Sequence, residues 1–257
     1  MTGITPIIEL RDISKSYGNN TALSGINISV YPGEVHCLLG DNGAGKSTLI
    51  KMMSGVVPPS TGQILFDGKP VNLASPREAM AYGIATVHQD VGSIPLLGVA
   101  RNFFLGVEPT KGWGPFKRID FDKAGEIAIE HIRAMGISRV TDPDQLVGTM
   151  SGGERQALAI ARALYLGAKV LILDEPTAAL GVRESSVVID AIRKARAQGV
   201  ALVFITHNAP HAFAVGDRYT VLLQGRVAAS FSRGEKTLDE LTTWMAGGKK
   251  IAEDATV

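Results

Sequence analysis

Short apolar runs alternate with amphipathic stretches along most of this chain. Apolar or nearly apolar runs lie at 35–39, 84–89, 170–173 and 201–206. Runs of this length, with few polar residues between the apolar ones, are typical of strands that a parallel sheet buries on both faces. Apolar residues at helical spacing predict helices at 46–54 and 182–198, the second ended by Gly199. This order of elements predicts an α/β fold with a mostly parallel central sheet.

Two further regions differ from this alternation. Residues 7–30 combine β-forming residues with turns at "YGNN" and "SG", which predicts antiparallel strands. Between 95 and 167 the strand pattern is replaced by helical patterns. In one of these, Ile127, Ile132 and Met135 fall near one face of a helix. We therefore predict an N-terminal antiparallel β subdomain and an inserted helical lobe.

The pattern sets approximate boundaries for these parts. The expected parts are a core at 1–94 and 168–246 that includes the β subdomain, a helical lobe at 95–167, and a flexible tail at 247–257. Within the core, 63–69 is expected to be an edge strand and 218–230 a late pair of strands. A chain of 257 residues can bury such a core as one domain with an insertion.

Composition and charge exclude several classes of protein. Hydrophobic residues make up 45% and charged residues 20%, as in ordinary globular proteins. The 26 Lys and Arg residues balance 25 Asp and Glu residues, so no net field draws the chain to nucleic acid or an acidic membrane. The single cysteine, Cys37, cannot form an internal disulfide and is expected to be a core residue in a reducing compartment. Neither a leader pattern nor a membrane-spanning apolar run is seen, so a cytosolic chain is expected unless a partner holds it elsewhere.

A glycine-rich turn directly follows the run at 35–39. The segment "GDNGAGKSTL" spaces Gly40, Gly45, Lys46 and Ser47 as in a phosphate-binding loop. Glycines let backbone N–H groups surround phosphate oxygens, and the N-terminus of the following helix adds positive potential. Lys46 is expected to reach the β and γ phosphates, and Ser47 is expected to hold Mg²⁺. The turn predicts a P-loop nucleoside triphosphatase; the alternative is an ordinary glycine-rich turn between a strand and a helix.

Polar residues follow or end the other apolar runs. Asp174 and Glu175 follow one run, His207 follows another, and Gln89 ends a third. If these runs are parallel neighbours, their ends meet Gly40 at one edge of the sheet, where open α/β sheets bind ligands. Asp174 is suited to Mg²⁺, and Glu175 is suited to polarising the water that attacks the γ phosphate. Taken singly, the carboxylates could form a solvated acidic turn, and Gln89 and His207 could be structural.

The segment "MSGGERQALAIARAL" is not explained by a single-chain kinase or GTPase site. Ser151 is a natural N-cap, and Gly152 and Gly153 bare the backbone N–H groups of the next helical turn. This pattern predicts a second anion site; the alternative is a plain capped helix with incidental glycines.

In this order the segments resemble the motifs of the ATP-binding cassette (ABC) ATPases over nearly the whole chain. "GDNGAGKST" resembles Walker A, Gln89 the Q-loop glutamine, "SGGER" the signature motif, "LILDE" Walker B, and His207 the switch histidine. The resemblance implies ATP and Mg²⁺ as ligands and catalytic roles for Glu175, His207 and Gln89. It implies nucleotide binding by Tyr17, which matches the adenine-stacking aromatic, and by Gly40, Asn42, Gly43, Gly45, Lys46, Ser47, Thr48, Ser151, Gly152 and Gly153. The metal residues that it implies are Ser47, Gln89 and Asp174.

The resemblance also implies a dimer. In this family two cassettes meet head to tail, so that the signature of one closes on the γ phosphate held by the other. Each motif occurs once here, so the partner is a second ABC cassette, identical or related. Glu154 replaces the more usual glutamine, a common variant, and Gly181 stands where the D-loop commonly has an aspartate. The second departure concerns coupling between the two sites rather than the chemistry.

Further stretches, among them "HQDVGSIPLLGVARNFFLG", "EPTAALGVRES" and "WMAGG", resemble the cassettes of bacterial monosaccharide importers. This implies transmembrane permease subunits as separate chains, a solute-binding protein that acts through them, and a place at the cytoplasmic face of the inner membrane. The apolar residues Ile94, Leu97, Phe103 and Phe104 form either a permease contact or the core of the lobe. The predicted function is ATP hydrolysis that energises monosaccharide uptake.

Three alternatives remain open. The importer could take another small solute, the chain could be a soluble ABC ATPase that acts on ribosomes or DNA, or it could be a regulator without useful hydrolysis. For the second, only "KGWGPFKR" at 111–118 combines basic and aromatic residues, and a solvated loop explains it better, so no nucleic-acid partner is expected. Gly181 suggests the third, but the catalytic residues predicted above are all present.

Overall fold

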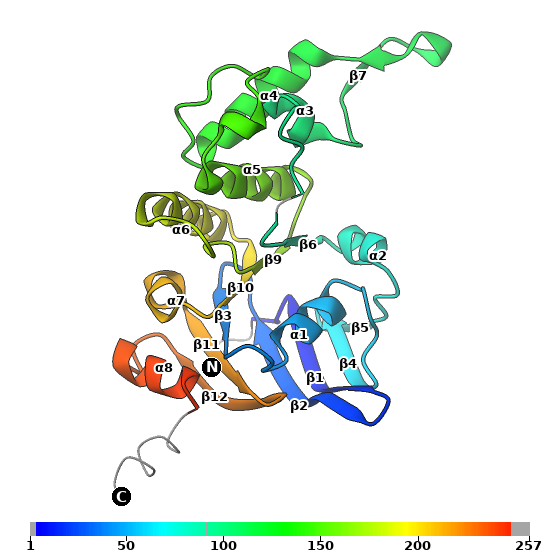
Figure 1. Ribbon diagram of the computed structural model, residues 1–257. Coiled ribbons are helices and arrows are strands. Elements are labelled where there is room, and N and C mark those ends of the chain that lie inside the picture. Colours follow the sequence, from blue (N-terminus) through cyan, green and yellow to red (C-terminus); the bar gives the residue numbers. More distant parts are fainter. Residues whose placement is uncertain (1–3, 91, 248–257) are drawn as a thin grey trace, which may run out of the picture. The chain divides into compact units, whose positions relative to one another are not determined.

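The computed structural model describes residues 4–90 and 92–247, and the chain divides into two compact units (Figure 1). The first unit comprises Met1–Thr86, Ala168–Pro176 and Arg196–Val257, and the second comprises Val87–Gly167 and Thr177–Ala195. Apart from Gly247, the predicted flexible tail lies outside the described residues.

The first unit begins with an antiparallel sheet of four strands in the order β2-β1-β4-β5. The strands are β1 (Ile8–Tyr17), β2 (Asn20–Val30), β4 (Thr61–Phe66) and β5 (Lys69–Val71). The antiparallel strands predicted at 7–30 are confirmed, because β1 and β2 pair antiparallel.

The prediction of one edge strand at 63–69 is wrong. Asp67 and Gly68 both have positive φ, so they form a tight turn that folds β5 back on β4. As a result, β4 lies inside the sheet between β1 and β5. The edge falls on β5, where Pro70 lacks the N–H that an inner strand would need.

A second sheet of the described chain has six strands in the order β12-β11-β3-β10-β9-β6. They are β3 (Val35–Leu39), β6 (Ile84–Val87), β9 (Val170–Asp174), β10 (Ala201–Thr206), β11 (Arg218–Leu223) and β12 (Arg226–Ser232). β3, β9, β10 and β11 run parallel, and β12 pairs antiparallel with β11. The mostly parallel sheet and the late strand pair are therefore confirmed. β6 is an edge strand that ends two residues before Gln89, so the predicted run was too long.

One apolar cluster joins residues of both sheets in the first unit. The helices of the first unit are α1 (Lys46–Met53), α2 (Pro76–Ala81), α7 (Ala209–Val215) and α8 (Leu238–Met245). Leu49 and Ile50 of α1 lie in this cluster together with Val203 and Ile205 of β10. Phe204, whose side chain alternates to the other face of β10, is also fully buried. Burial on both faces explains why this strand has no polar alternation in the sequence.

Cys37 is a core residue, as predicted. It is fully buried on β3, and its Sγ lies 3.6 Å from Ala212 O of α7. Burial raises the pKa of the thiol far above its ordinary value, so the unreactive protonated form is kept at neutral pH.

The second unit is mainly helical. It contains α3 (Val99–Phe104), α4 (Phe121–Ala134), α5 (Gly152–Tyr165), most of α6 (Val182–Ala197), the hairpin β7 (Thr110–Lys111) and β8 (Arg118–Ile119), and short 3₁₀ turns at Gly114–Phe116 and Val147–Thr149. Phe103 and Phe104 are at most 1% exposed and pack on Tyr165, with ring centroids 5.3 and 5.2 Å apart. These two are therefore lobe core, whereas Ile94 is 39% exposed and Leu97 is half-buried.

Helix α6 groups with the helical unit, although we placed its residues in the core. Its first turn lies close to α5, since a Cβ on Gly153 would lie 2.3 Å from Glu184 O. Lys194 near its end lies close to Gly136, the glycine that follows α4. Contacts between helices far apart in sequence decide this grouping.

The segment at 111–118 forms the β7–β8 hairpin. Trp113 and Phe116 are 79% and 74% exposed, and their rings pack edge to face. Lys111 Nζ lies 2.9 Å from Asp120 Oδ1, and this pairing raises the pKa of Lys111 and lowers the pKa of Asp120. The hairpin therefore compensates part of its own positive charge.

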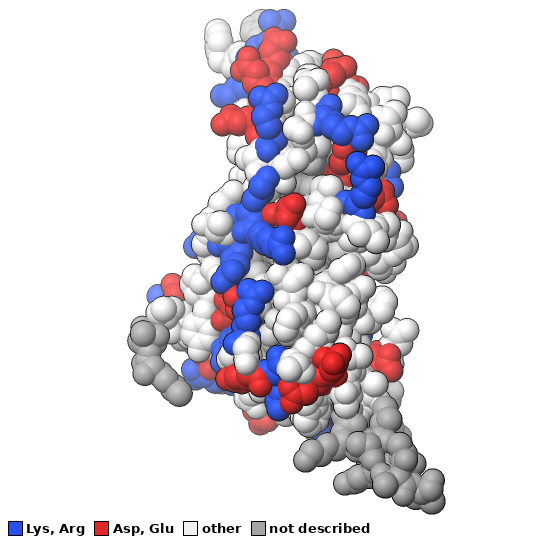
Figure 2. Space-filling view, turned by 90° about the vertical axis from the view of Figure 1, so that its left-hand side faces the viewer, with Lys and Arg blue, Asp and Glu red and all other residues white. Residues whose placement is uncertain are grey.

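Charges of both signs occur on the face of the molecule drawn in Figure 2. Figure 2 shows Lys and Arg side chains lying next to Asp and Glu side chains on one face, in keeping with the net charge of +1. In the described ranges 4–90 and 92–247, none of the helices is long and apolar enough to cross a membrane.

Candidate active site

The phosphate-loop turn connects β3 to α1. Gly40 has φ +143°, and a Cβ there would lie 2.4 Å from Leu222 O. Gly45 is the N-cap of α1 with φ +106°, and no described side chain caps that helix. The backbone can bend this tightly because both positions lack a Cβ. The first N–H groups of α1 are left for another acceptor, which suits an anion.

Lys46 is held inside this loop. It is only 8% exposed, and its Nζ donates to Gly40 O at 2.6 Å and to Asp41 O at 3.1 Å. The two carbonyls orient the ammonium but do not neutralise it. A phosphate in the loop would supply the missing negative charge.

The strand register brings three of the predicted site residues to one edge of the sheet. Thr206 of β10 pairs with Leu39 of β3, and Ile205 pairs with Asp174 of β9. Gly40, Glu175 and His207 each follow one of these three adjacent parallel strands. These three positions therefore meet at one edge of the sheet, as predicted. Their catalytic roles remain predictions.

Glu175 and His207 form a pair at this edge. His207 Nδ1 lies 2.9 Å from Glu175 Oε1, and an ionised carboxylate can only accept, so Nδ1 donates. The side chain of Glu175 is 16% exposed and that of His207 63%. Glu175 Oε2 is buried and has no hydrogen-bond partner among the described residues. One oxygen of this carboxylate thus remains available to bind a proton.

The backbone of Glu175 is strained. Its φ is +49°, in the left-handed region that a glutamate rarely adopts, and its N–H donates to Ile205 O at 3.0 Å. Such conformations cost about 1–3 kcal/mol and gather at functional sites. The turn keeps the carboxylate beside His207 in spite of this cost.

The other predicted residues of the first unit lie around the loop or at its strand ends. Asn42, Gly43 and Ser47 are exposed, Thr48 is half-buried in the first turn of α1, and Asp174 is half-buried at the end of β9. Tyr17 ends β1 and is 47% exposed. Lys15, two residues before Tyr17, pairs with Leu23 of the neighbouring strand β2. The side chain of Leu23 in turn lies against Gly45 of the loop, because a Cβ on Gly45 would meet Leu23 Cδ2. The strand register therefore places Tyr17 on the hairpin that contacts the loop.

Gln89 and the signature segment belong to the second unit. Gln89 is exposed, and its carbonyl accepts a hydrogen bond from Gln156 Nε2 of α5 at 3.1 Å. Sequence reasoning missed Gln156, because 67 residues separate the pair. A residue of the signature helix thus holds the backbone of the Q-loop position.

The signature segment begins α5 with a capping box. Ser151 Oγ accepts from Glu154 N at 3.3 Å, and Glu154 Oε2 accepts from Ser151 N at 2.8 Å. The predicted N-cap is therefore found. Gly152 N donates to Glu184 Oε1 at 2.9 Å. We did not single out Glu184, although a glutamate three residues after a helix N-cap position is a recognisable capping pattern.

The site suits a nucleoside triphosphate. The glycine cradle, the uncapped α1 and the buried Lys46 ammonium favour phosphate, and Glu175 offers an unpaired carboxylate oxygen. No group of three or more His, Cys, Asp or Glu residues in the described chain could hold a metal ion alone. The fold and the site together define a P-loop nucleotide-binding ATPase.

Comparison with known proteins identifies the family. A family model described as ABC transporter matches residues 23–178, and the chain belongs to this family. It is 40% identical to the fructose import ATP-binding protein of Rhizobium meliloti over 97% of both chains. It is 39% identical to the xylose/arabinose import ATP-binding protein of Sulfolobus acidocaldarius over 94% of both chains.

Other relatives are longer, and the fold matches solved cassettes. The chain is 41% identical to a ribose import ATP-binding protein of Geobacillus kaustophilus but covers only 49% of its length. A crystal structure of an ATP-binding cassette of an ABC transporter in its ADP conformation matches with a TM-score of 0.80 and 25% identity, over 98% of this chain and 100% of that one. The resemblance to ABC ATPases and the predicted P-loop fold are thereby confirmed.

Proposed function

We propose that this chain is the ATP-hydrolysing subunit of an importer that takes up a monosaccharide through separate permease subunits. The observation that supports hydrolysis most directly is the Glu175–His207 pair beside the phosphate loop, with Glu175 Oε2 buried and unpaired. The names of the relatives support the substrate class, because fructose, xylose/arabinose and ribose are all monosaccharides.

The chain's own groups would divide the chemistry between them. The backbone N–H groups of the loop and Lys46 would hold the β and γ phosphates of ATP, and Tyr17 would stack on the adenine. Glu175 would orient a water and take its proton at Oε2. His207, which donates through Nδ1 to the other oxygen, would hold this carboxylate in place.

Mg²⁺ would accompany the nucleotide. The hydroxyl of Ser47 and the carboxylate of Asp174 lie in the first unit, and Gln89 is the third predicted ligand. Hard oxygen donors of this kind suit Mg²⁺, which keeps most of its coordination for phosphate oxygens and water. The ion would offset charge on the phosphates.

A second cassette would complete the site. The N-terminus of α5, with Ser151, Gly152 and Gly153, would face the γ phosphate held by the partner cassette. Closure on ATP and reopening after hydrolysis would drive the permease. Cassettes with this fold have been solved as dimers, one of them with ADP and Pi.

The permease contact is assigned to a groove within the helical unit. The groove has a volume of about 870 Å³, and its apolar lining includes Leu97, Ala100, Leu105, Phe121 and Ile129. Such a groove fits the apolar face of a short helix. A permease helix bound there would hold the chain at the cytoplasmic face of the inner membrane.

The test of this function is uptake of labelled pentoses, hexoses and amino acids in cells that lack the gene. We expect the wild-type gene to restore uptake of one sugar and Lys46→Ala to restore none. Restored uptake of an amino acid would replace the sugar with another solute. If no uptake changes while the purified chain hydrolyses ATP, a soluble role would be favoured instead.

The assigned base has its own test. Glu175→Gln should bind ATP with nearly normal affinity but lower kcat by about 10²–10⁴-fold, the usual contribution of a general base. Lys46→Ala serves as the contrast, because it should weaken ATP binding itself. Full turnover in Glu175→Gln would refute the assignment.

A further inference from the structure

The amides at the start of α5 already hold protein carboxylates. Ser151 N–H donates to Glu154 Oε2 within the capping box, and Gly152 N–H donates to Glu184 Oε1 at 2.9 Å. Both acceptors are glutamates, although this is the turn that the proposed function assigns to a phosphate. Glu154 belongs to the turn itself, whereas Glu184 comes from α6.

The same Glu184 carboxylate also holds the turn before α6. Its Oε2 accepts from Gly181 N–H at 3.1 Å, and Gly181 O accepts the first helical hydrogen bond from Ser185 N at 2.9 Å. Gly181 is therefore the N-cap of α6, and Glu184 provides one half of a capping box. The other half is missing because a glycine has no side chain to return the bond. One carboxylate thus bridges the D-loop position and the signature turn.

The two turns are packed too closely for this contact to be incidental. A Cβ on Gly153 would lie 2.3 Å from Glu184 O, and a Cβ on Gly152 would lie 2.5 Å from Leu180 Cδ2. The signature glycines therefore have a second role besides exposing their N–H groups. Because they lack a Cβ, the start of α6 can pack directly against the start of α5. All of these residues belong to the second unit, and Glu184 is half-buried there.

A phosphate and Glu184 would compete for the same donor. Gly152 has one N–H, and a γ phosphate that approaches it would also meet the negative charge of Glu184 at close range. The Glu154 carboxylate is held by its own helical turn, so Glu184 is the group whose movement frees an amide of the signature.

We propose that Glu184 is a positioning residue that occupies the signature anion site while the cassette is not paired with a second one. Its carboxylate must release Gly152 N–H before the γ phosphate held by the partner cassette can bind there. The inference rests on the proposed pairing of cassettes. Because the other oxygen of Glu184 is bound to Gly181, closure at the signature is linked to the D-loop turn through this one side chain. This link involves Gly181, the D-loop position at which the family commonly has an aspartate.

The experiment measures the ATP concentration that gives half-maximal dimer, by light scattering at fixed protein concentration, in a Glu175→Gln parent. Adding Glu184→Gln keeps the size of the side chain and one acceptor oxygen but removes the charge. We expect it to lower the half-maximal ATP concentration by about two- to fivefold, the range for one charge at a helix terminus. The difference should shrink in high salt, because it is electrostatic.

Asp190→Asn is the matched control, because it removes one negative charge from the exposed face of the same helix. It should leave the half-maximal ATP concentration unchanged. Glu184→Ala, which removes both hydrogen bonds, should lower the concentration as Glu184→Gln does, and it should speed hydrogen exchange at the Gly152 amide. ATP affinity of the single cassette, measured with a fluorescent analogue at low protein concentration, should not change in any variant.

Three outcomes would overturn the inference. An unchanged half-maximal concentration in Glu184→Gln would show that the carboxylate does not compete with phosphate. A raised half-maximal ATP concentration would show that the Glu184 carboxylate stabilises the dimer instead of opposing its formation. If the parent itself forms no dimer with ATP, the proposed pairing of cassettes fails, and this inference fails with it.

Discussion

At the scale of single residues, two glycines of the phosphate loop differ in what surrounds them. A Cβ on Gly40 would lie 2.4 Å from a backbone oxygen, whereas a Cβ on Gly43 would meet nothing within 4 Å, and φ is positive at both. Gly40→Ala should therefore shift the loop, lower the melting temperature, destabilise the fold by about 1–3 kcal/mol and weaken ATP binding. Gly43→Ala should cost only the left-handed backbone strain of about 1–2 kcal/mol. Equal melting temperatures would show that the loop relaxes freely.

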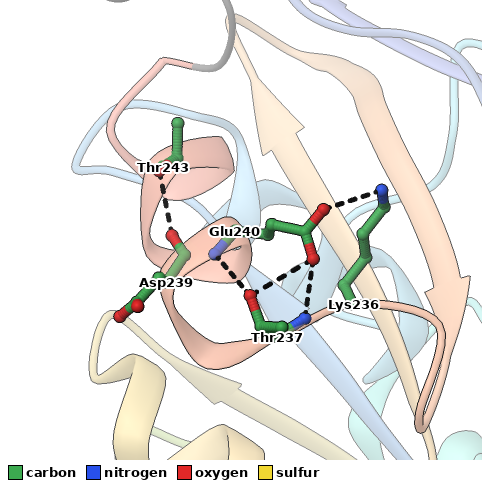
Figure 3. A network of polar contacts seen from close by, with 5 residues as sticks. All are labelled: Lys236, Thr237, Asp239, Glu240 and Thr243. Carbon is green, nitrogen blue, oxygen red and sulfur yellow. Dashed lines mark hydrogen bonds and ion pairs between the residues drawn. The ribbon is translucent and has the colours of Figure 1, made fainter.

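At the scale of elements, the N-terminus of α8 has a capping box of its own. Glu240 Oε2 accepts from Thr237 N at 2.8 Å, and Lys236 Nζ lies 3.1 Å from Glu240 Oε1. Figure 3 shows both contacts as dashed lines. The backbone N–H of Thr237, and next the Lys236 ammonium, lower the pKa of Glu240 below its ordinary value of 4.5. The charged form is therefore favoured in the folded helix.

A pH-dependent stability follows from this cap. Because the folded pKa is the lower one, the contribution of Glu240 is present above pH 4.5 and is lost as the pH falls through the folded pKa. Glu240→Gln should lower the melting temperature at neutral pH, and its difference from wild type should shrink in acid. Asp239→Asn, in the same turn, is the control. A difference that stays constant with pH would contradict the role assigned to the charge.

At the scale of the whole molecule, the helical unit should meet its permease through the groove. Phe121 is 59% exposed in that groove, and Trp113 is 79% exposed on the hairpin outside its lining. Phe121→Ser should reduce copurification with the permease and reduce uptake, while ATP hydrolysis by the isolated chain should stay unchanged. Trp113→Ser should have no effect on either. Because both positions are exposed, neither change should alter stability by more than about 0.5 kcal/mol.

Much of the fold and of the site could be predicted because the signals are local. Apolar runs of four to six residues identified β3, β9 and β10, and glycine spacing identified the loop between β3 and α1. In these segments, backbone conformation and chemistry both depend on residues that are neighbours in the chain. The signal for the hairpin between β4 and β5 is equally local, because an Asp-Gly pair favours a tight turn with positive φ at both residues. The prediction of a single strand at 63–69 did not use this signal.

Contacts across long stretches of chain could not be read in this way. Glu175 with His207, Gly152 with Glu184, and Gln89 with Gln156 are separated by 32, 32 and 67 residues. Each of these residues has a plausible structural role when taken singly, and strand register or helix packing selects its partner. The chain's order of residues therefore specified the phosphate loop and the family of the protein. Folding alone determined which carboxylate meets the signature amides, because that contact depends on how closely α5 and α6 can approach.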